Sequence, residues 1–188
     1  MRKRFFSVVL AVVALSPISQ SQQKELVPKS EESSMTYTLV HPLHKVEATS
    51  KGVQYHVQAD PVTREIKSVS ASVDVMTFDS GNSSRDSHAM EVIDAISYPE
   101  ASFSSTSVAR NGDSIEVAGR LTFHGVTKDI VLGAMTKWSQ GRLEVDGGFE
   151  VSLTAFNIER PALLLIPVED RLTFSFAAVF EIESLTTR

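Results

Sequence analysis

The chain has 188 residues, of which 42% are hydrophobic, 22% charged and 7% aromatic. This composition suits one globular domain and excludes collagen-like, coiled-coil and disordered proteins. Cysteine is absent, so disulfides, thiolate metal sites and cysteine nucleophiles are excluded, and stability must come from a packed core. A formal net charge of −5 argues against a phosphate-binding surface, and we expect no nucleic-acid partner.

The first 21 residues have the pattern of a secretory signal peptide. Arg2-Lys3-Arg4 precedes an apolar run from Phe5 to Leu15, and a small polar stretch follows Pro17. The apolar run is only eleven residues long, whereas a helix needs roughly 20 to span a bilayer. We therefore expect residues 1–21 to be removed on export, no membrane segment in the mature chain, and a periplasmic or secreted protein.

The next segment, residues 22–34, is rich in Gln, Lys, Glu and Ser and has few apolar residues. Such a composition cannot build a core, so we expect a flexible leader here. The folded domain is then expected to span residues 35–188.

Alternating apolar and polar residues dominate the chain beyond this leader. From Val69 to Val75 every second residue is apolar, which is typical of a strand with one buried and one solvent-facing side. The same pattern predicts long strands at 69–75, 115–123, 143–153 and 172–182. Shorter candidates lie at 36–40, 53–59, 101–108 and 127–134.

Turn signals separate these strands, at Asp60-Pro61, Asn111-Gly112-Asp113, His124-Gly125 and Gln140-Gly141. Helical crossovers of a dozen residues, which parallel pairing needs, are missing almost everywhere, so we expect antiparallel pairing. The sequence therefore predicts an all-β fold, either a barrel or a sandwich.

One segment breaks the alternation. Between Ser83 and Ile96 apolar residues recur at helical spacing, and Ser83 with Asp86 matches a capping box. Tyr98-Pro99 is expected to end the helix, because the residue before a proline is disfavoured in the helical region. We predict a short helix whose apolar stripe covers one end of the sheet.

Two motifs resemble those of the YceI-like family. The first is FDSGNSSRDSH at Phe78–His88, continued by YPEASFSST at Tyr98–Thr106, and the second is GRLTFHGVTK at Gly119–Lys128. The resemblance covers roughly residues 44–183. It implies an exported, lipocalin-like, eight-stranded antiparallel β-barrel with one short helix. It also implies a binding protein, not an enzyme, whose interior holds a polyisoprenoid such as a polyprenyl phosphate or an isoprenoid quinone tail.

Two departures from the family pattern are visible. The span from His44 to Val69 is shorter than usual by about a strand's length. Ala155-Phe156-Asn157-Ile158 replaces the family's Asp-Phe-Gly-Ile stretch. These differences resemble a shorter branch of the family.

The inward rows of the predicted strands are rich in phenylalanine. A barrel of about eight strands is either filled by side chains or just holds one small ligand, so these rows decide the function. The expected ligand-binding lining consists of Phe103, Leu121, Phe123, Phe149, Val151, Phe174, Phe176 and Phe180. This lining suits a hydrocarbon tail. The alternative, in which the same side chains simply fill the barrel, stays open.

Arg85, Asp86 and His88 lie where a loop enters the predicted helix. The simplest interpretation of Asp86 is structural, because a carboxylate in a first helical turn is favoured. We assign Arg85 and His88 to the ligand-binding set, in which Arg85 and the free helix amides would meet a headgroup phosphate or a quinone oxygen. The competing enzymatic interpretation uses Asp86 and His88 as acid and base.

Other chemistry finds little support in the sequence. His41 and His44 lack the spacing of a helical zinc pair, so no metal site and no cofactor are expected. His124, in a tight turn, is expected to hydrogen-bond to backbone. The sequence contains no nucleophile elbow, P-loop or dinucleotide-binding fingerprint.

The prediction is therefore an exported protein that binds an isoprenoid lipid or quinone. The alternative is a non-enzymatic structural or interaction module with a filled barrel, which docks to a partner or membrane through the run Ala162–Ile166. The oligomeric state is left open, a dimer included.

Overall fold

A computed structural model describes residues 23–182. The expected signal peptide, residues 1–21, lies outside these described residues and stays a prediction. The strands are β1 (Lys24–Pro28), β2 (Ser34–His41), β3 (His44–Ser50), β4 (Gln54–Asp60), β5 (Glu65–Asp74), β6 (Glu100–Asn111), β7 (Ser114–Phe123), β8 (Val126–Ser139), β9 (Arg142–Val151), β10 (Ala162–Leu163), β11 (Ile166–Pro167) and β12 (Leu172–Glu181). The helices are α1 (Ser83–Val92) and the 3-10 helices η1 (Ser30–Glu32), η2 (Val75–Thr77) and η3 (Thr154–Phe156).

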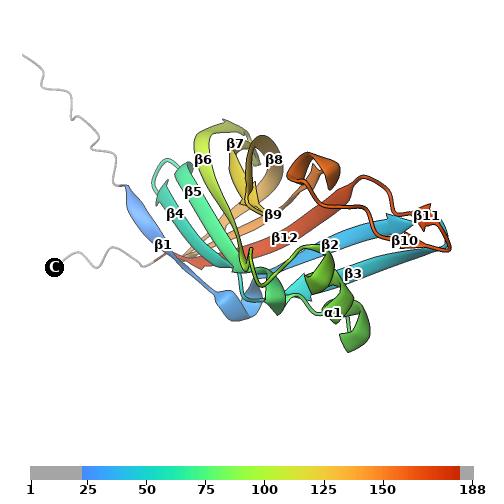
Figure 1. The fold of residues 1–188 in the computed structure, drawn as a ribbon. Coiled ribbons are helices and arrows are strands. Elements are labelled where there is room, and N and C mark those ends of the chain that lie inside the picture. Colours follow the sequence, from blue (N-terminus) through green and yellow to red (C-terminus); the bar gives the residue numbers. More distant parts are fainter. Residues whose placement is uncertain (1–22, 183–188) are drawn as a thin grey trace, which may run out of the picture.

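Eight of the strands form a closed antiparallel barrel. Around the ring the order is β1, β4, β5, β6, β7, β8, β9 and β12. β12 returns to β1 through the pairs Val27 with Glu181 and Pro28 with Phe180, which closes the sheet. The predicted eight-stranded antiparallel barrel with one short helix is therefore confirmed (Figure 1).

The β2–β3 hairpin extends the barrel at one end. β12 pairs with β1 at its C-terminal end, and its N-terminal part pairs instead with β2, from Leu172 opposite Leu39 to Ala177 opposite Ser34. η1 lies in the chain between β1 and β2, at the point where β12 changes partner. As a result, β1 and β4 close one end of the barrel, while the β2–β3 hairpin, α1 and the short β10–β11 hairpin flank the other (Figure 1).

The expectation of a flexible leader at residues 22–34 is wrong for most of that segment, because it contains β1 and η1. Leu26 is 1% exposed and lies opposite Val57 of β4. β1 needs few apolar residues because it forms backbone hydrogen bonds to a neighbouring strand on each edge. The folded domain therefore starts about ten residues earlier than the sequence composition indicated.

The predicted strands correspond to β2, β4, β5, β6, β7, β8, β9 and β12. Strand β3 has no counterpart among them. Its sequence HKVEATS contains only two hydrophobic residues, Val46 and Ala48, too few for a clear alternation. β3 pairs with β2 along its whole length, so pairing defines this strand more than hydrophobicity does.

The predicted helix is correct in place but not in its ends. It stops at Val92, well before Tyr98-Pro99, and Ile96 is 93% exposed. Its N-cap is Asn82, whose side-chain oxygen accepts from the Arg85 N–H at 3.0 Å, and not Ser83. An Asn in this position is as good a cap as Ser, so the N-cap lies one residue earlier than predicted.

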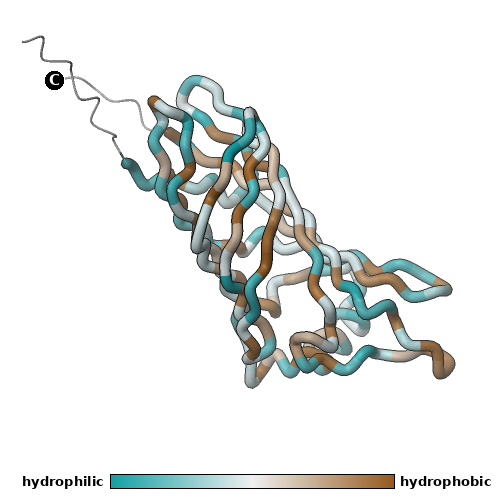
Figure 2. The backbone as a smooth tube through the Cα atoms, turned by 90° about the horizontal axis from the view of Figure 1, so that it is seen from above, coloured by the Kyte–Doolittle hydropathy of each residue, from teal (hydrophilic) through white to brown (hydrophobic). Residues whose placement is uncertain are grey.

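The core is the inside of the barrel. Alternate residues on each strand point inward, and Figure 2 shows this alternation of hydrophobic and hydrophilic residues along the strands. The largest fully buried hydrophobic side chains are Phe156, Phe180, Leu26, Leu143, Ile158 and Val117.

Candidate functional site: an apolar cavity in the barrel

The barrel contains a cavity of about 390 Å³. This volume is within the range of about 300 to 1,000 Å³ that is typical of small-molecule sites. Side chains from β4 round the ring to β12, from the β2–β3 hairpin and from α1 form its walls. The walls are apolar except for Tyr37, His41, His44, Tyr55, Ser72, Arg85, His88 and Ser102. The interior is thus not filled by its own side chains.

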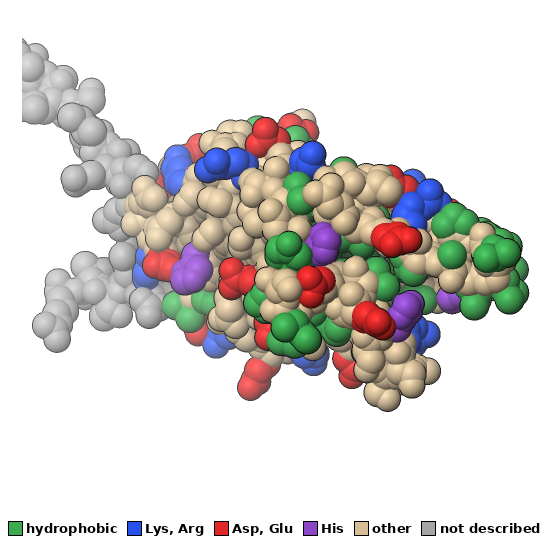
Figure 3. Space-filling view, viewed as in Figure 1, with side chains coloured by type: hydrophobic (Ala, Val, Ile, Leu, Met, Phe, Trp, Pro, Cys, Tyr) green, Lys and Arg blue, Asp and Glu red, His purple; other side chains and the backbone are tan. Residues whose placement is uncertain are grey.

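The exposed members of the lining locate the opening of the cavity. They are His44 on β3, Arg85 and His88 on α1, and Ala162 and Leu163 on β10, whereas the other lining residues are buried or half-buried. The mouth therefore lies between the β2–β3 hairpin, α1 and β10, opposite the end that β1 closes. Figure 3 shows hydrophobic side chains gathered at the end of the molecule that carries β10 and β11.

Most of the ligand-binding residues predicted from the sequence line this cavity. They are Phe103, Leu121, Phe123, Phe149, Phe174, Phe176, Phe180, Arg85 and His88. Val151 does not line the cavity: it is 6% exposed and packs in the core. Val151 is the last residue of β9, opposite Leu172 of β12.

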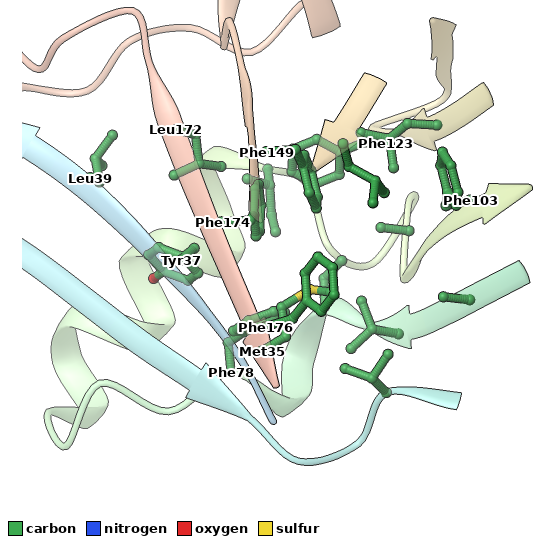
Figure 4. A pocket seen from close by; sticks show the side chains of 18 of the residues that line it. Met35, Tyr37, Leu39, Phe78, Phe103, Phe123, Phe149, Leu172, Phe174 and Phe176 are labelled. Carbon is green, nitrogen blue, oxygen red and sulfur yellow. The ribbon is translucent and has the colours of Figure 1, made fainter. Parts of the chain in front are cut away.

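Aromatic rings form one side of the cavity. Phe149 on β9 and Phe174 on β12 stack with ring centroids 4.8 Å apart and 14° between their planes (Figure 4). This parallel arrangement presents a flat apolar surface, which suits contact with a hydrocarbon chain. Phe176, on the same face of β12, lies further along the cavity.

Gly147 explains how the ring of Phe176 fits against the wall. A Cβ on Gly147 would lie 2.6 Å from Phe176 Cζ and 2.6 Å from Ala134 Cβ. Such distances are not tolerated, so the glycine provides the space that the ring occupies. The bare backbone of β9 at this position thus helps to shape the cavity.

The part of the lining that β2 and the segment before α1 supply was not predicted from the sequence. Met35, Tyr37 and Leu39 of β2 line the cavity, and Phe78 packs against Tyr37 with centroids 5.3 Å apart (Figure 4). The alternation of Met35, Tyr37 and Leu39 was the signal that would have placed them on an inward face. Burial raises the pKa of the Tyr37 hydroxyl, and the nearby Asp86 carboxylate raises it further.

Tyr55 on β4 places a polar atom inside the apolar interior. Its side chain lines the cavity, is 7% exposed, and its ring meets that of Phe180 edge to face at 5.9 Å. Within residues 23–182 the buried hydroxyl has no hydrogen-bond partner. Burial raises the pKa of Tyr55, so the hydroxyl stays protonated and is a donor.

The loop before α1 holds Arg85 close to its own backbone. Arg85 donates from Nε to Ser80 Oγ and from a terminal nitrogen to the Ser80 carbonyl, both at 2.8 Å. Asp86 accepts from the Ser80 N–H at 3.2 Å and from its hydroxyl. His88 Nδ1 lies 3.8 Å from Glu91 Oε2. The guanidinium of Arg85 and the imidazole of His88 are thus exposed at the mouth, and Asp86 stabilises the loop.

This arrangement does not support an acid–base pair of Asp86 and His88. Asp86 is directed to Ser80 and does not line the cavity, whereas His88 does. Residues two apart on a helix point in different directions, so the two groups do not face one substrate.

The surroundings of the remaining histidines do not indicate a metal site. His124 Nδ1 lies 2.9 Å from the Phe156 carbonyl oxygen, which is the backbone hydrogen bond expected from the sequence. Among residues 23–182 no group of three or more potential ligands could hold a metal ion. None of the helices in the described part of the chain has the length and apolarity needed to cross a membrane.

A closed antiparallel barrel with an apolar cavity open at one end defines the lipocalin-like class of folds. The model of the YceI-like domain family matches residues 26–180, and the chain belongs to this family. The family resemblance of the two sequence motifs is thereby confirmed.

Proteins with similar sequences include YceI and UPF0312 proteins of other bacteria. Protein YceI of Escherichia coli O157:H7 is 30% identical over 99 residues, a match that covers 48% of this chain and 52% of that protein. The chain thus spans about half the length of this relative. A UPF0312 protein of Vibrio cholerae is 29% identical over 170 residues, which is 85% of this chain and 90% of the relative.

Solved structures with the same fold include BcnA of Burkholderia cenocepacia and a domain from Saccharophagus degradans. BcnA superimposes with a TM-score of 0.73 at 22% identity and covers 81% of this chain and 98% of its own. The Saccharophagus protein is described as a polyisoprenoid binding domain implicated in plant cell wall breakdown. Its TM-score is 0.65 at 12% identity, covering 85% of this chain and 98% of its own.

Proposed function

We propose that this chain is an exported protein that binds an isoprenoid lipid, such as a polyprenyl phosphate or an isoprenoid quinone, inside its barrel. The observation that carries the proposal is the apolar cavity of about 390 Å³, whose exposed lining residues lie on β3, α1 and β10. A polyisoprenoid-binding domain with the same fold supports this class of ligand.

The chemistry of the lining favours a hydrocarbon tail over a polar substrate. An apolar wall offers no directed hydrogen bonds to orient polar groups, and it leaves such groups without the partners they have in water. Burying a carbon atom contributes about 0.8 kcal/mol, so each five-carbon isoprene unit contributes about 4 kcal/mol before the costs of association. A few buried units therefore suffice for firm binding.

The polar end of the ligand is proposed to lie at the mouth. Arg85 and His88 are the exposed nitrogen-bearing side chains that line the cavity next to α1. A guanidinium there favours a phosphate or a quinone oxygen. Because Arg85 already donates twice to Ser80, its role is to provide a fixed positive charge at the opening.

Export to the periplasm or the cell exterior belongs to the same proposal. It rests on the basic start, the apolar run from Phe5 to Leu15 and the small polar residues after it. A carrier of isoprenoids in that compartment would shield the tail of its ligand from water.

The alternative of a structural or interaction module required a filled barrel. The cavity favours the binding function over that alternative. Docking through the exposed run at Ala162–Ile166 does not depend on filling, and it is compatible with a ligand in the barrel.

The test is native mass spectrometry of the mature protein purified from the envelope of its own host. Organic extraction then identifies whatever was bound. The expected result is a stoichiometric isoprenoid lipid, whose length and headgroup are read directly. A protein that arrives empty, and stays empty when offered quinones and polyprenyl phosphates, would refute the proposal.

A pair of variants tests whether the ligand binds inside the cavity. Ala71 on β5 lines the cavity between Tyr55 and Phe103, which flank it on the neighbouring strands. We expect Ala71→Phe to reduce the bound lipid at least tenfold, because the new ring occupies the space of several buried carbons. Ser70→Phe adds a ring one residue earlier, on the outward side of β5, and should retain the lipid.

A further inference from the structure

We infer that this protein docks on a lipid bilayer through two apolar turns that border the mouth of its cavity. The turns are the β2–β3 turn with Leu43 and the β10–β11 turn with Leu164 and Leu165. The inference rests on the proposed function, because the bilayer is where an isoprenoid ligand would be collected or released.

The two turns expose large aliphatic side chains. Leu165 is 97% exposed, Leu164 76% and Leu43 61%. Leu163 and Ile166, which flank the β10–β11 turn, are also exposed, at 46% and 41%. Isolated exposed leucines are common, but a cluster of this kind on projecting turns is characteristic of an interaction site.

The β10–β11 turn has a backbone that leucine does not favour. Leu163 pairs with Ile166, so Leu164 and Leu165 form a two-residue hairpin loop, and their φ angles are +52° and +67°. Both values are positive, as in a type I′ turn, for which Asn-Gly is the preferred sequence. Leucine at both positions works against the fold of the turn, so its side chains serve a purpose outside the fold.

One buried histidine holds the two turns in a fixed relation. His41, 3% exposed at the end of β2, accepts through Nδ1 from the Leu43 N–H at 3.1 Å. Its Nε2 therefore carries the proton and donates to the Ile166 carbonyl at 2.9 Å. Glu169 N–H donates to the Val40 carbonyl at 2.9 Å and fixes the segment after β11. The apolar turns are thus preorganised for docking.

The same turns are continuous with the opening of the cavity. His41 and His44, on either side of Leu43, line the cavity, and so do Ala162 and Leu163. A lipid that leaves a bilayer touching these turns would enter the barrel along an apolar path. Figure 1 shows both hairpins projecting from the same end of the molecule, away from α1 and the barrel.

The chemistry of the surface matches a bilayer better than a protein. The segment 161–168 contains no charged residue, and its exposed side chains are all aliphatic: alanine, proline, leucine and isoleucine. Protein interfaces are enriched in aromatic residues and arginine, whereas the large exposed side chains of the two turns are leucine and isoleucine. Aliphatic side chains on projecting turns can instead enter the acyl boundary of a bilayer.

The test removes the leucines and keeps the turn. The variant Leu164→Asn with Leu165→Gly has the preferred type I′ sequence, so it should fold at least as well as the wild type, which a thermal melt checks. A matched control replaces two exposed side chains on the barrel wall, Val131→Ser with Met135→Ser, which are 58% and 56% exposed. Each protein is mixed with vesicles of phosphatidylethanolamine and phosphatidylglycerol, and flotation gives the bound fraction.

We expect the wild type and the control to float with the vesicles. The partition coefficient of the turn variant should be roughly tenfold lower. A second measurement follows transfer of a short-chain isoprenoid quinone between vesicles, which the turn variant should slow by a similar factor. Its affinity for the same quinone in solution should stay unchanged, because the cavity is intact.

The outcomes separate the two proposals. If the wild type fails to float, or the turn variant floats equally well, the docking inference is wrong whatever the cavity binds. If the wild type floats but takes up no isoprenoid, the docking surface stands and the proposed function fails. A concentration-dependent dimer that the turn variant abolishes, without vesicle binding, would assign the surface to a second copy of the chain.

Discussion

Tyr55 places a polar hydroxyl in the largely apolar interior of the cavity. The hydroxyl is buried and lacks a partner within the described residues, which costs about 1 to 3 kcal/mol. We expect Tyr55→Phe to raise the free energy of unfolding of the ligand-free protein by about 1 kcal/mol, since it removes that polar atom and keeps the ring contact with Phe180. Urea denaturation monitored by circular dichroism measures the difference.

A loss of stability in Tyr55→Phe would contradict this prediction, because it would show that the hydroxyl has a partner in the folded protein. Tyr37→Phe is a suitable comparison. Tyr37 also lines the cavity, but it is half-buried, and Asp86 and Arg85 lie close enough to act on its pKa. We expect no gain in stability there.

Gly147 permits a second test at the scale of one residue. A methyl group at this position would lie 2.6 Å from Phe176 Cζ and from the Gly133 carbonyl oxygen. The backbone oxygen cannot move away easily, so Gly147→Ala should destabilise the protein by about 1 to 3 kcal/mol, the usual cost of overpacking. Thermal and urea unfolding measure this loss.

Gly133→Ala is the matched control for this variant. Gly133 lies on the neighbouring strand β8, and nothing approaches its Cβ position within 4 Å. Alanine suits a strand better than glycine, so the control should be neutral or slightly stabilising. Equal losses in both variants would mean that loss of glycine flexibility, and not the contact with Phe176, is the cause.

The residues of the cavity were predictable where alternation is long. Phe174, Phe176 and Phe180 follow one another on a strand of ten residues, so period two alone places them on one face. Tyr55 and the residues of β2 were missed, because short strands give few repeats. Whether the inward side chains fill the barrel or leave a cavity depends on closure and on gaps such as Gly147, which periodicity does not report.

At the scale of elements, ion pairs connect η1 to the barrel. Arg142 on β9 donates to Glu32 of η1 at 2.8 Å and to Glu144 at 2.8 Å, and Lys137 lies 3.2 Å from Glu144. The hydrogen bond from Arg142 lowers the pKa of Glu32 below its ordinary value of about 4.5. The hydrogen bonds from Lys137 and Arg142 do the same to the pKa of Glu144.

The sign of the resulting pH dependence follows from these lowered values. A carboxyl group whose pKa is lower in the folded than in the unfolded state stabilises the fold above its unfolded value, and this contribution is lost as the pH falls through the folded value. We expect Arg142→Gln to destabilise the protein at pH 7 and the difference from the wild type to shrink below about pH 4.5. Unfolding midpoints between pH 3 and pH 7 test this.

Since Glu32 and Lys137 are exposed and Arg142 and Glu144 only half-buried, the effect should be small and should weaken with salt. Lys67→Gln is a comparison away from η1: the hydrogen bond from Lys67 lowers the pKa of Glu65 on β5, so this variant should show the same sign of pH dependence. A difference between Arg142→Gln and the wild type that grows at low pH would contradict the prediction.

Some strands and helices form because of their own local sequence, whereas others form because they pair with neighbouring strands. The long strands β5 to β9 and β12 carry alternation strong enough to be found from the sequence, and Asn82 begins α1 by capping it. β1 and β3 form because β4, β12 and β2 offer unpaired strand edges. No local pattern marks them, and that is why a flexible leader was expected in place of β1.

At the scale of the whole molecule, the strand β12 determines both how the barrel closes at one end and which hairpin lies at the mouth of the cavity. β12 pairs with β1 at one end, which seals the barrel, and with β2 at the other, which carries the β2–β3 hairpin to the mouth. The two ends of the cavity therefore differ: one is the mouth and the other is sealed. Along the inward face of β12 it extends from Leu172 near the mouth to Phe180 at the sealed end.

This difference between the ends predicts how ligand length depends on depth. Ala178 lies between Phe176 and Phe180 on the inward face of β12 and is 3% exposed. Ala178→Leu should shorten the cavity at its sealed end, so that the longest isoprenoid loses roughly tenfold in affinity while short chains bind as before. A series of isoprenoid quinones of increasing length, titrated by native mass spectrometry, measures the dependence.

Ala177→Leu adds the same atoms one residue earlier, on the outward face of β12 opposite Asp146 and Ser34, and should leave the dependence on length unchanged. A uniform loss for all chain lengths in Ala178→Leu would point to a general disturbance of the barrel, which unfolding measurements would reveal. If unfolding is unchanged, a uniform loss would instead mean that ligands enter headgroup first, because a ligand of any length would then place its headgroup at the sealed end. The polar group would then lie at the sealed end near Tyr55, and Arg85 and His88 at the mouth would contact the tail.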